Sequence, residues 1–175
     1  YLSQKIGMRV KCNNKIYDVE PLEVISKDKI DNESLELHQW LPNVVIELIN
    51  EFYKTMGKEI YNIYKTLYKD RFERVRFSET LDTSYMIPVQ FLNKSYVQIG
   101  SARKHICEEQ LSSLAHEEGH CIGFLINPYG YIDEHRSFKE IESIFFQMLA
   151  CRFFSKELNT PFFDNQLKEM LEFYY

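Results

Sequence analysis

Apolar residues recur at helical spacing in two neighbouring segments, residues 42–56 and 60–68. Within each segment they lie three or four positions apart, which places them on one face of a helix. The helical pattern begins at Pro42. Gly57 separates the two segments, so the sequence predicts either one long helix kinked at this residue or two helices between about residues 42 and 70.

Apolar and polar residues alternate in two other regions, which indicates strands. Residues 8–12 and 15–19 flank Asn13 and Asn14, and because Asn tolerates positive φ, this pair predicts a two-residue hairpin.

Residues 73–100 predict a second set of strands. Val75 and Phe77 alternate with arginines, and residues 85–91 and 96–100 flank a connection suited to a hairpin. Pro88 cannot donate to a sheet ladder, so its strand should lie at an edge or carry a bulge. We predict a small antiparallel sheet in this region.

The C-terminal half predicts three more helices. Residues 111–124 and 137–150 carry apolar residues at helical spacing, and the sequence Asn-Pro-Tyr-Gly at residues 127–130 separates them. Asn-Thr-Pro at residues 159–161 supplies a cap and a first-turn proline for a last helix, which should pack on the two before it. The predicted fold class is therefore α+β, with two antiparallel helices against the sheet and additional helices.

The composition indicates a folded domain. Of 175 residues, 45% are hydrophobic and 15% aromatic, which is typical of a globular protein and excludes a disordered chain. The length favours a single domain over residues 1–175. Because the sequence begins at Tyr1 instead of Met, a fragment of a longer chain is the open alternative.

Charge and cysteine spacing narrow the expected partners. The formal net charge is −5, and acidic residues interrupt the one basic run, residues 69–76, so we expect a solvated face there and no nucleic-acid binding. No apolar run approaches the roughly 18 residues that a membrane span requires, so no membrane partner is expected. The four cysteines lack CxxC spacing, which favours reduced, buried thiols and a cytoplasmic location. The oligomeric state is not indicated.

The residues His116-Glu117-Glu118-Gly119-His120 form the motif H-E-x-x-H. One helical turn separates the two histidines, so both imidazoles project from one face and can bind one metal ion. Glu117 lies about 100° round the helix, where it can reach a water without binding the metal. Cys121 also points about 100° away from His120, so we do not expect it to be a ligand.

A third ligand is needed, because two histidines at this spacing also arise by chance on a solvated helix. Glu140 follows His120 by twenty positions, on the next predicted helix. If Ser137 caps that helix, Glu140 would instead complete a capping box, and Glu142 would be the ligand. We favour Glu140, because Ser143, Gln147 and Cys151 lie near it on the helical wheel together with Ile144, and small or polar groups can support a ligand. Two histidines and a carboxylate leave a position open, as in catalytic zinc sites.

These two segments resemble the active-site helices of the gluzincin metallopeptidases. Residues 114–120 and 140–147 are similar to those of oligoendopeptidase F and thimet oligopeptidase, where a serine follows the ligand glutamate by three positions and Glu or Gln by seven, as Ser143 and Gln147 do here. The pattern E-x-x-[AS]-x-x-F also resembles the small ImmA/IrrE-type metalloproteases. The resemblance spans about residues 85–155. It implies a zincin-like fold in which a strand before the zinc helix pairs with extended substrate.

The chain also departs from these families. Glu118 stands where an apolar residue is usual, which predicts a wetter helix face. The His/Tyr-rich region that the oligopeptidases carry further downstream is missing. Tyr129, Tyr131 and His135 are the candidates for stabilising the oxyanion of the transition state.

The predicted activity is zinc-dependent hydrolysis of peptide bonds in peptide or protein substrates. One Zn²⁺ per chain is expected on His116, His120 and Glu140, with Glu117 as general base. Two alternatives are a site-specific regulatory protease of the ImmA/IrrE kind and a non-catalytic zinc-binding regulator that retains the scaffold.

Overall fold

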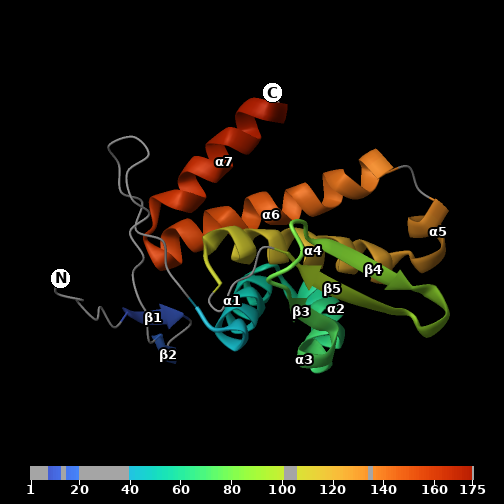
Figure 1. Ribbon diagram of the computed structural model, residues 1–175, viewed down its shortest axis with the longest axis horizontal. Coiled ribbons are helices and arrows are strands. Elements are labelled where there is room, and N and C mark those ends of the chain that lie inside the picture. The colour runs from blue at the N-terminus through green and yellow to red at the C-terminus, as the bar shows by residue number, and fades with distance from the viewer. Residues whose placement is uncertain (1–7, 13–14, 20–39, 101–105, 134–135, 175) are drawn as a thin grey trace.

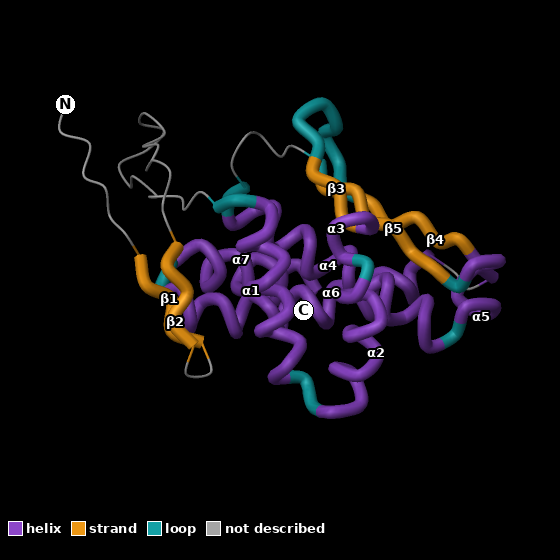
Figure 2. The backbone as a smooth tube through the Cα atoms, turned by 90° about the horizontal axis from the view of Figure 1, so that it is seen from below, coloured by secondary structure: helices purple, strands orange, loops and turns teal. Residues whose placement is uncertain are grey.

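A computed structural model describes residues 8–12, 15–19, 40–100, 106–133 and 136–174 of the chain (Figure 1). Helices dominate, and a small three-stranded sheet lies along one side of them (Figure 2). This arrangement confirms the α+β class. The two longest helices are α4 (Glu108–Ile126) and α6 (Arg136–Leu158), which pack against each other. None of the helices described here combines the length and the apolar character needed to cross a membrane.

Residues 42–69 form two helices, α1 (Pro42–Thr55) and α2 (Lys58–Lys69), which decides between the two predicted arrangements. Gly57 separates them with a φ of 87°, a value that side-chain-bearing residues rarely adopt. The short helix α3 (Arg71–Arg74) then leads into the sheet.

The sheet contains β3 (Val75–Phe77), β4 (Tyr85–Val89) and β5 (Lys94–Ile99) in the order β3-β5-β4. The predicted hairpin is confirmed, since β4 and β5 pair antiparallel through the 3₁₀ turn η1 (Gln90–Leu92). However, β3 runs parallel to β5, so the prediction of an antiparallel sheet is wrong. The chain crosses from β3 to the far side of β5 before β4 begins, and β3 and β5 therefore point the same way.

The edge position of Pro88 is confirmed. Among the strands that the structure describes, β4 pairs with β5 alone. The N-terminal hairpin is confirmed as well: β1 (Met8–Cys12) and β2 (Lys15–Val19) pair antiparallel, with Cys12 opposite Lys15 and hence a two-residue connection.

The core lies where α1, α2, α4 and α6 meet. Aromatic side chains fill its centre: Phe52 and Tyr53 from α1, Tyr64 from α2, and Phe146 and Phe154 from α6 are all buried. The Tyr53 and Tyr64 rings stack with centroids 4.1 Å apart. Burying each such side chain contributes about 1.5–3 kcal/mol, so this cluster holds α1, α2 and α6 together.

The last helix, α7 (Pro161–Tyr174), begins as predicted. The hydroxyl of Thr160 accepts the backbone N–H of Phe162 at 3.4 Å, which caps the helix. The Phe163 ring packs on Phe154 with centroids 5.4 Å apart. The sequence predicts packing on both motif helices, whereas this contact places α7 against α6, from which it diverges towards the C-terminus (Figure 1).

Candidate metal centre

Helix α4 carries the motif, and its start is fixed by local chemistry. The N–H of Cys107, at the N-cap, donates to the side chain of Gln110 at 3.1 Å. Glu108 and Glu109 occupy the first turn, where negative charge is favourable. The helix then continues without interruption to Ile126, so His116 and His120 lie one turn apart on one face.

Glycine allows α6 to approach α4 closely beside the histidines. A Cβ at Gly119 would lie 2.9 Å from the Cα of Ser143 and 3.2 Å from the Cβ of Phe146. Real Cβ atoms essentially never lie as close as 2.9 Å to another residue's Cα. The absence of a side chain at this position therefore brings Glu140, one turn before Ser143, within reach of the histidines.

Three potential ligand atoms converge between the two helices. The Nε2 atoms of His116 and His120 lie 3.3 Å and 3.6 Å from Oε2 of Glu140. One donor atom from each residue fits within 4.8 Å of the others. Glu142, the alternative ligand, instead lies against Gly123, one turn beyond His120.

Ser137, the candidate N-cap in the alternative interpretation of Glu140, is not the cap of α6. Helix α6 already begins at Arg136, so Ser137 lies within its first turn. The capping-box role for Glu140, which depends on this cap, therefore falls away.

Both histidines present Nε2 to the cluster because Nδ1 is engaged elsewhere. Nδ1 of His116 lies 3.1 Å from Oε1 of Gln147, and Nδ1 of His120 lies 2.9 Å from the hydroxyl of Tyr131. Burial lowers the pKa of His116, and burial together with the neighbouring His116 lowers the pKa of His120 to about 4. Both imidazoles are therefore neutral at pH 7, which is the form that binds metal.

Glu117 lies beside this cluster, and the pKa of its carboxyl group is raised. Its side chain is 6% exposed. Burial and the nearby Glu140 raise its pKa to about 7, although a hydrogen bond from the backbone N–H of Met86 in β4 opposes the rise. A carboxyl group with a pKa near neutrality can both accept and release a proton at physiological pH.

Glu118 contradicts the expectation of a wetter face. It is 1% exposed and forms an ion pair with Arg74, which is 5% exposed. The guanidinium also reaches Sγ of Cys121 and the carbonyl oxygen of Leu67, each at 3.4 Å. The basic run at residues 69–76 is accordingly not a wholly solvated face, because its Arg74 is buried beneath α4. A charged residue enters the core here because its partner neutralises it.

Three of the cysteines lie in the described part of the chain, and all three are free thiols: Cys107, Cys121 and Cys151. Cys121 and Cys151 are buried, as predicted, whereas Cys107 is only partly buried. Burial raises the pKa of Cys121 to about 12. Cys121 faces Arg74, away from the histidine cluster, as the helical wheel predicts.

The candidates for oxyanion stabilisation differ in position. Tyr129, in the short helix α5 (Pro128–Asp133), is 77% exposed. Tyr131 is buried, and its hydroxyl lies on Nδ1 of His120, the side of the ring remote from Nε2. This position favours orientation of His120 over contact with a substrate. His135 lies outside the described residues.

Neither Ser112 nor the contacts of Gln147 and Tyr131 with the two histidines are predicted from the sequence. Gln147 Nε2 donates to Ser112 Oγ at 2.9 Å, so these two side chains and His116 form one connected group. Ser112 could have been found from its position one turn before His116 on the same helix face. Gln147 could have been found from its position two turns after Glu140 on α6.

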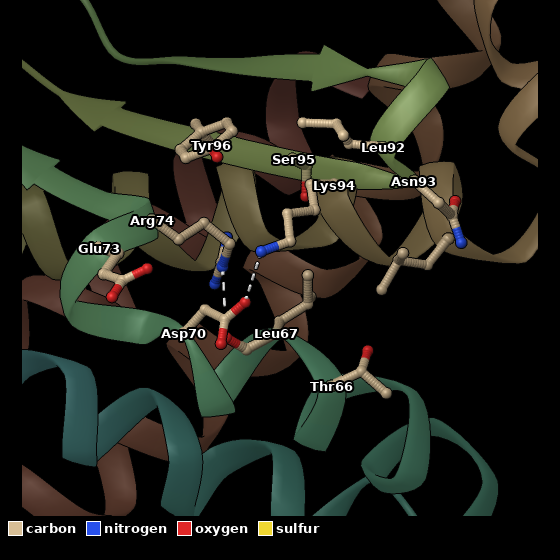
Figure 3. Close-up of a pocket in the computed structure, with 11 residues that line it drawn as sticks. Thr66, Leu67, Asp70, Glu73, Arg74, Leu92, Asn93, Lys94, Ser95 and Tyr96 are labelled. Atoms are coloured by element: carbon tan, nitrogen blue, oxygen red, sulfur yellow. Dashed lines mark hydrogen bonds and ion pairs between the residues drawn. The ribbon is translucent and has the colours of Figure 1, made fainter.

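A separate cavity of about 220 Å³ lies among α2, α3 and β5, with Leu125 of α4 on its wall (Figure 3). Its charges are largely paired: Lys94 contacts Asp70 at 3.0 Å, and Arg74 is bound to Glu118. None of the three clustered ligand residues lines it.

The residues at the cluster fit a zinc ion. Two neutral imidazole nitrogens and one carboxylate oxygen are the donors of catalytic zinc sites, and the Nδ1 contacts are the outer support that such ligands usually have. Comparison with models of protein families, with curated proteins and with solved structures gives no match for this chain.

Proposed function

We propose that this protein is a zinc-dependent hydrolase of peptide bonds with a zincin-like arrangement of α4, α6 and the sheet. The observation that carries the proposal is the convergence of His116, His120 and Glu140, with Glu117 on the same helix as the two histidines. The gluzincin resemblance of the two segments supports the same conclusion. Zinc, when bound, supplies a Lewis acid that polarises the scissile carbonyl and acidifies the attacking water.

Glu117 acts as the general base in this proposal. Its carboxylate takes a proton from the water as the oxygen bonds to the carbonyl carbon, and it delivers that proton to the amine nitrogen as the C–N bond breaks. The products are a carboxylate and an amine. Gln147 and Tyr131 hold His116 and His120 in the orientation that presents Nε2 to the site.

The expected substrate is an extended segment lying along β4. The outer edge of this strand is unpaired among the described strands, and the Met86 N–H reaches Glu117, so the edge passes next to the base. Main-chain hydrogen bonds to an edge strand bind peptides with little sequence preference. The Glu140 side chain is 37% exposed, which fits an accessible site. Accessible segments of proteins, as well as short peptides, should therefore be cleaved.

The test compares zinc-loaded wild type with Glu117→Gln on a peptide library and on proteins with disordered tails. Wild type should cleave these substrates. The variant should keep its zinc but cleave about 10²–10⁴-fold more slowly, since it lacks the base. Equal cleavage by both would remove Glu117 from the mechanism. Zinc retained with no cleavage by either protein would favour the non-catalytic regulator.

A further inference from the structure

A line of polar side chains leads from His116 to the C-terminal helix. His116 Nδ1 lies 3.1 Å from Gln147 Oε1, and Gln147 Nε2 donates to Ser112 Oγ at 2.9 Å. Ser112 Oγ lies 3.8 Å from Cys151 Sγ, whose thiol donates to Gln166 Oε1 at 3.2 Å. The line thus alternates between α4 and α6 and ends on α7. Ser112 and Cys151 are 1% and 0% exposed, so water does not replace these contacts.

The line has a direction. Gln166 accepts from the Cys151 thiol, so the sulfur is free to accept the hydroxyl hydrogen of Ser112. Ser112 Oγ in turn accepts the Gln147 amide, which turns the amide oxygen of Gln147 towards His116. An oxygen at that place accepts only from Nδ1–H. In each hydrogen bond of the line, the donor is therefore the residue nearer to His116. The imidazole hydrogen lies on Nδ1, so Nε2 keeps its lone pair.

A competing arrangement would block metal binding. Two oxygens lie near His116 Nε2: Oε2 of Glu140 at 3.3 Å and Oγ of Ser143 at 3.2 Å. The Ser143 hydroxyl donates to the carbonyl oxygen of Glu140, so both the carboxylate and Ser143 Oγ favour a hydrogen on that nitrogen. Moving the hydrogen from Nδ1 to Nε2 would turn over the side-chain amide of Gln147 and reverse the Ser112 hydroxyl. Keeping the contact between Ser112 and Cys151 would then also require the amide of Gln166 to turn over. Nε2 would then lack the lone pair that a metal needs.

We propose that Gln147, Ser112, Cys151 and Gln166 form a directional hydrogen-bond relay that positions His116 for metal binding and couples the docking of α7 to the metal centre. This inference rests on the metal-binding part of the proposed function. These four are positioning residues, acting through His116. Outer partners of metal ligands typically contribute about 10–100-fold in metal affinity, and Gln147 and Ser112, nearest the ligand, should contribute most.

The amide of Gln147 makes a sharp test available. With Ser112→Ala, the amide loses the acceptor that fixes it and is free to turn over, so zinc affinity should fall about tenfold. In a Gln147→Glu background the side chain ends in two equivalent oxygens, so turning it over changes nothing at His116. Ser112→Ala should then leave zinc affinity unchanged. Ser113→Ala, the neighbouring serine on α4, is the matched control and should have no effect in either background.

Two measurements decide the proposal. In metal-free protein, ¹⁵N-detected NMR of the imidazoles should show His116 with its hydrogen on Nδ1, and Ser112→Ala should raise the share with the hydrogen on Nε2. Zinc affinity by chelator competition should show the background-dependent loss above and a smaller loss for Gln166→Ala, with Asn165→Ala on α7 as its control.

A wild-type His116 with its hydrogen on Nε2 would overturn the relay. An equal loss of affinity from Ser112→Ala in both backgrounds would also overturn it, because that pattern indicates packing alone. If no form binds zinc, the proposed function fails, while the metal-free NMR result still decides the direction of the relay.

Discussion

Replacing Glu117 with glutamine should stabilise the metal-free protein at alkaline pH. The carboxyl has a pKa of about 7 in the folded chain and an ordinary value of 4.5. Between pH 4.5 and pH 7 Glu117 has lost its proton in the unfolded chain but keeps it in the folded chain. The free energy of unfolding therefore falls as the pH rises through this range. Each tenfold change in proton affinity is worth about 1.4 kcal/mol, so ionised Glu117 costs about 3 kcal/mol at pH 8.

Glutamine has the same shape, still accepts the Met86 N–H and carries no charge. Glu117→Gln should therefore match wild type at pH 4 and exceed it by up to about 3 kcal/mol at pH 8, by urea unfolding in chelator. The histidines titrate in the same window, but they do so in both proteins and cancel in the difference. Glu169→Gln, on the exposed side of α7, is the control and should show no such dependence. A difference that is the same at pH 4 and pH 8, or lower stability at pH 8, would refute the reasoning.

Three further results are expected. Glu118→Leu should lower the free energy of unfolding by about 3–5 kcal/mol in urea, because Arg74 is left buried and unpaired. Adding Arg74→Met to this variant should recover most of the loss, and a double variant as unstable as the single one would argue against a buried, mutually neutralising pair. Gly119→Ala should cost about 1–3 kcal/mol and weaken zinc binding by forcing α4 and α6 apart, and unchanged zinc affinity would contradict that close approach. Tyr131→Phe should weaken zinc binding about tenfold through loss of the His120 contact, measured by chelator competition, and no change would leave Tyr131 without an orienting role.

Local patterns predict much of the helical part of the fold. Pro42 and Pro161 mark helix starts that the structure confirms, since each fits a first turn whose N–H groups lack partners. One-turn spacing similarly places His116 and His120 on one face. Glu140 is predictable as the partner carboxylate because the small or polar residues Ser143 and Gln147 follow it on the same face of α6.

The remaining features depend on which distant residues meet, and local patterns do not encode this. The order β3-β5-β4 results from a crossover between strands, so the parallel pair cannot be inferred from alternation alone. Arg74 sits in a run that looks solvated, and only its contact with Glu118, 44 positions away, explains its burial. The hydrogen bond from Gln147 to Ser112 likewise joins residues 35 positions apart.

X-ray absorption at the zinc edge tests the central claim most directly. Protein purified without chelator should contain one zinc per chain, with nitrogen and oxygen neighbours at about 2.0–2.2 Å and no sulfur neighbour. Replacing His116, His120 or Glu140 with alanine should remove most of the metal, and Glu117→Gln should retain it. A protein that takes up no zinc, or a zinc with a sulfur neighbour near about 2.3 Å, would contradict the proposed centre.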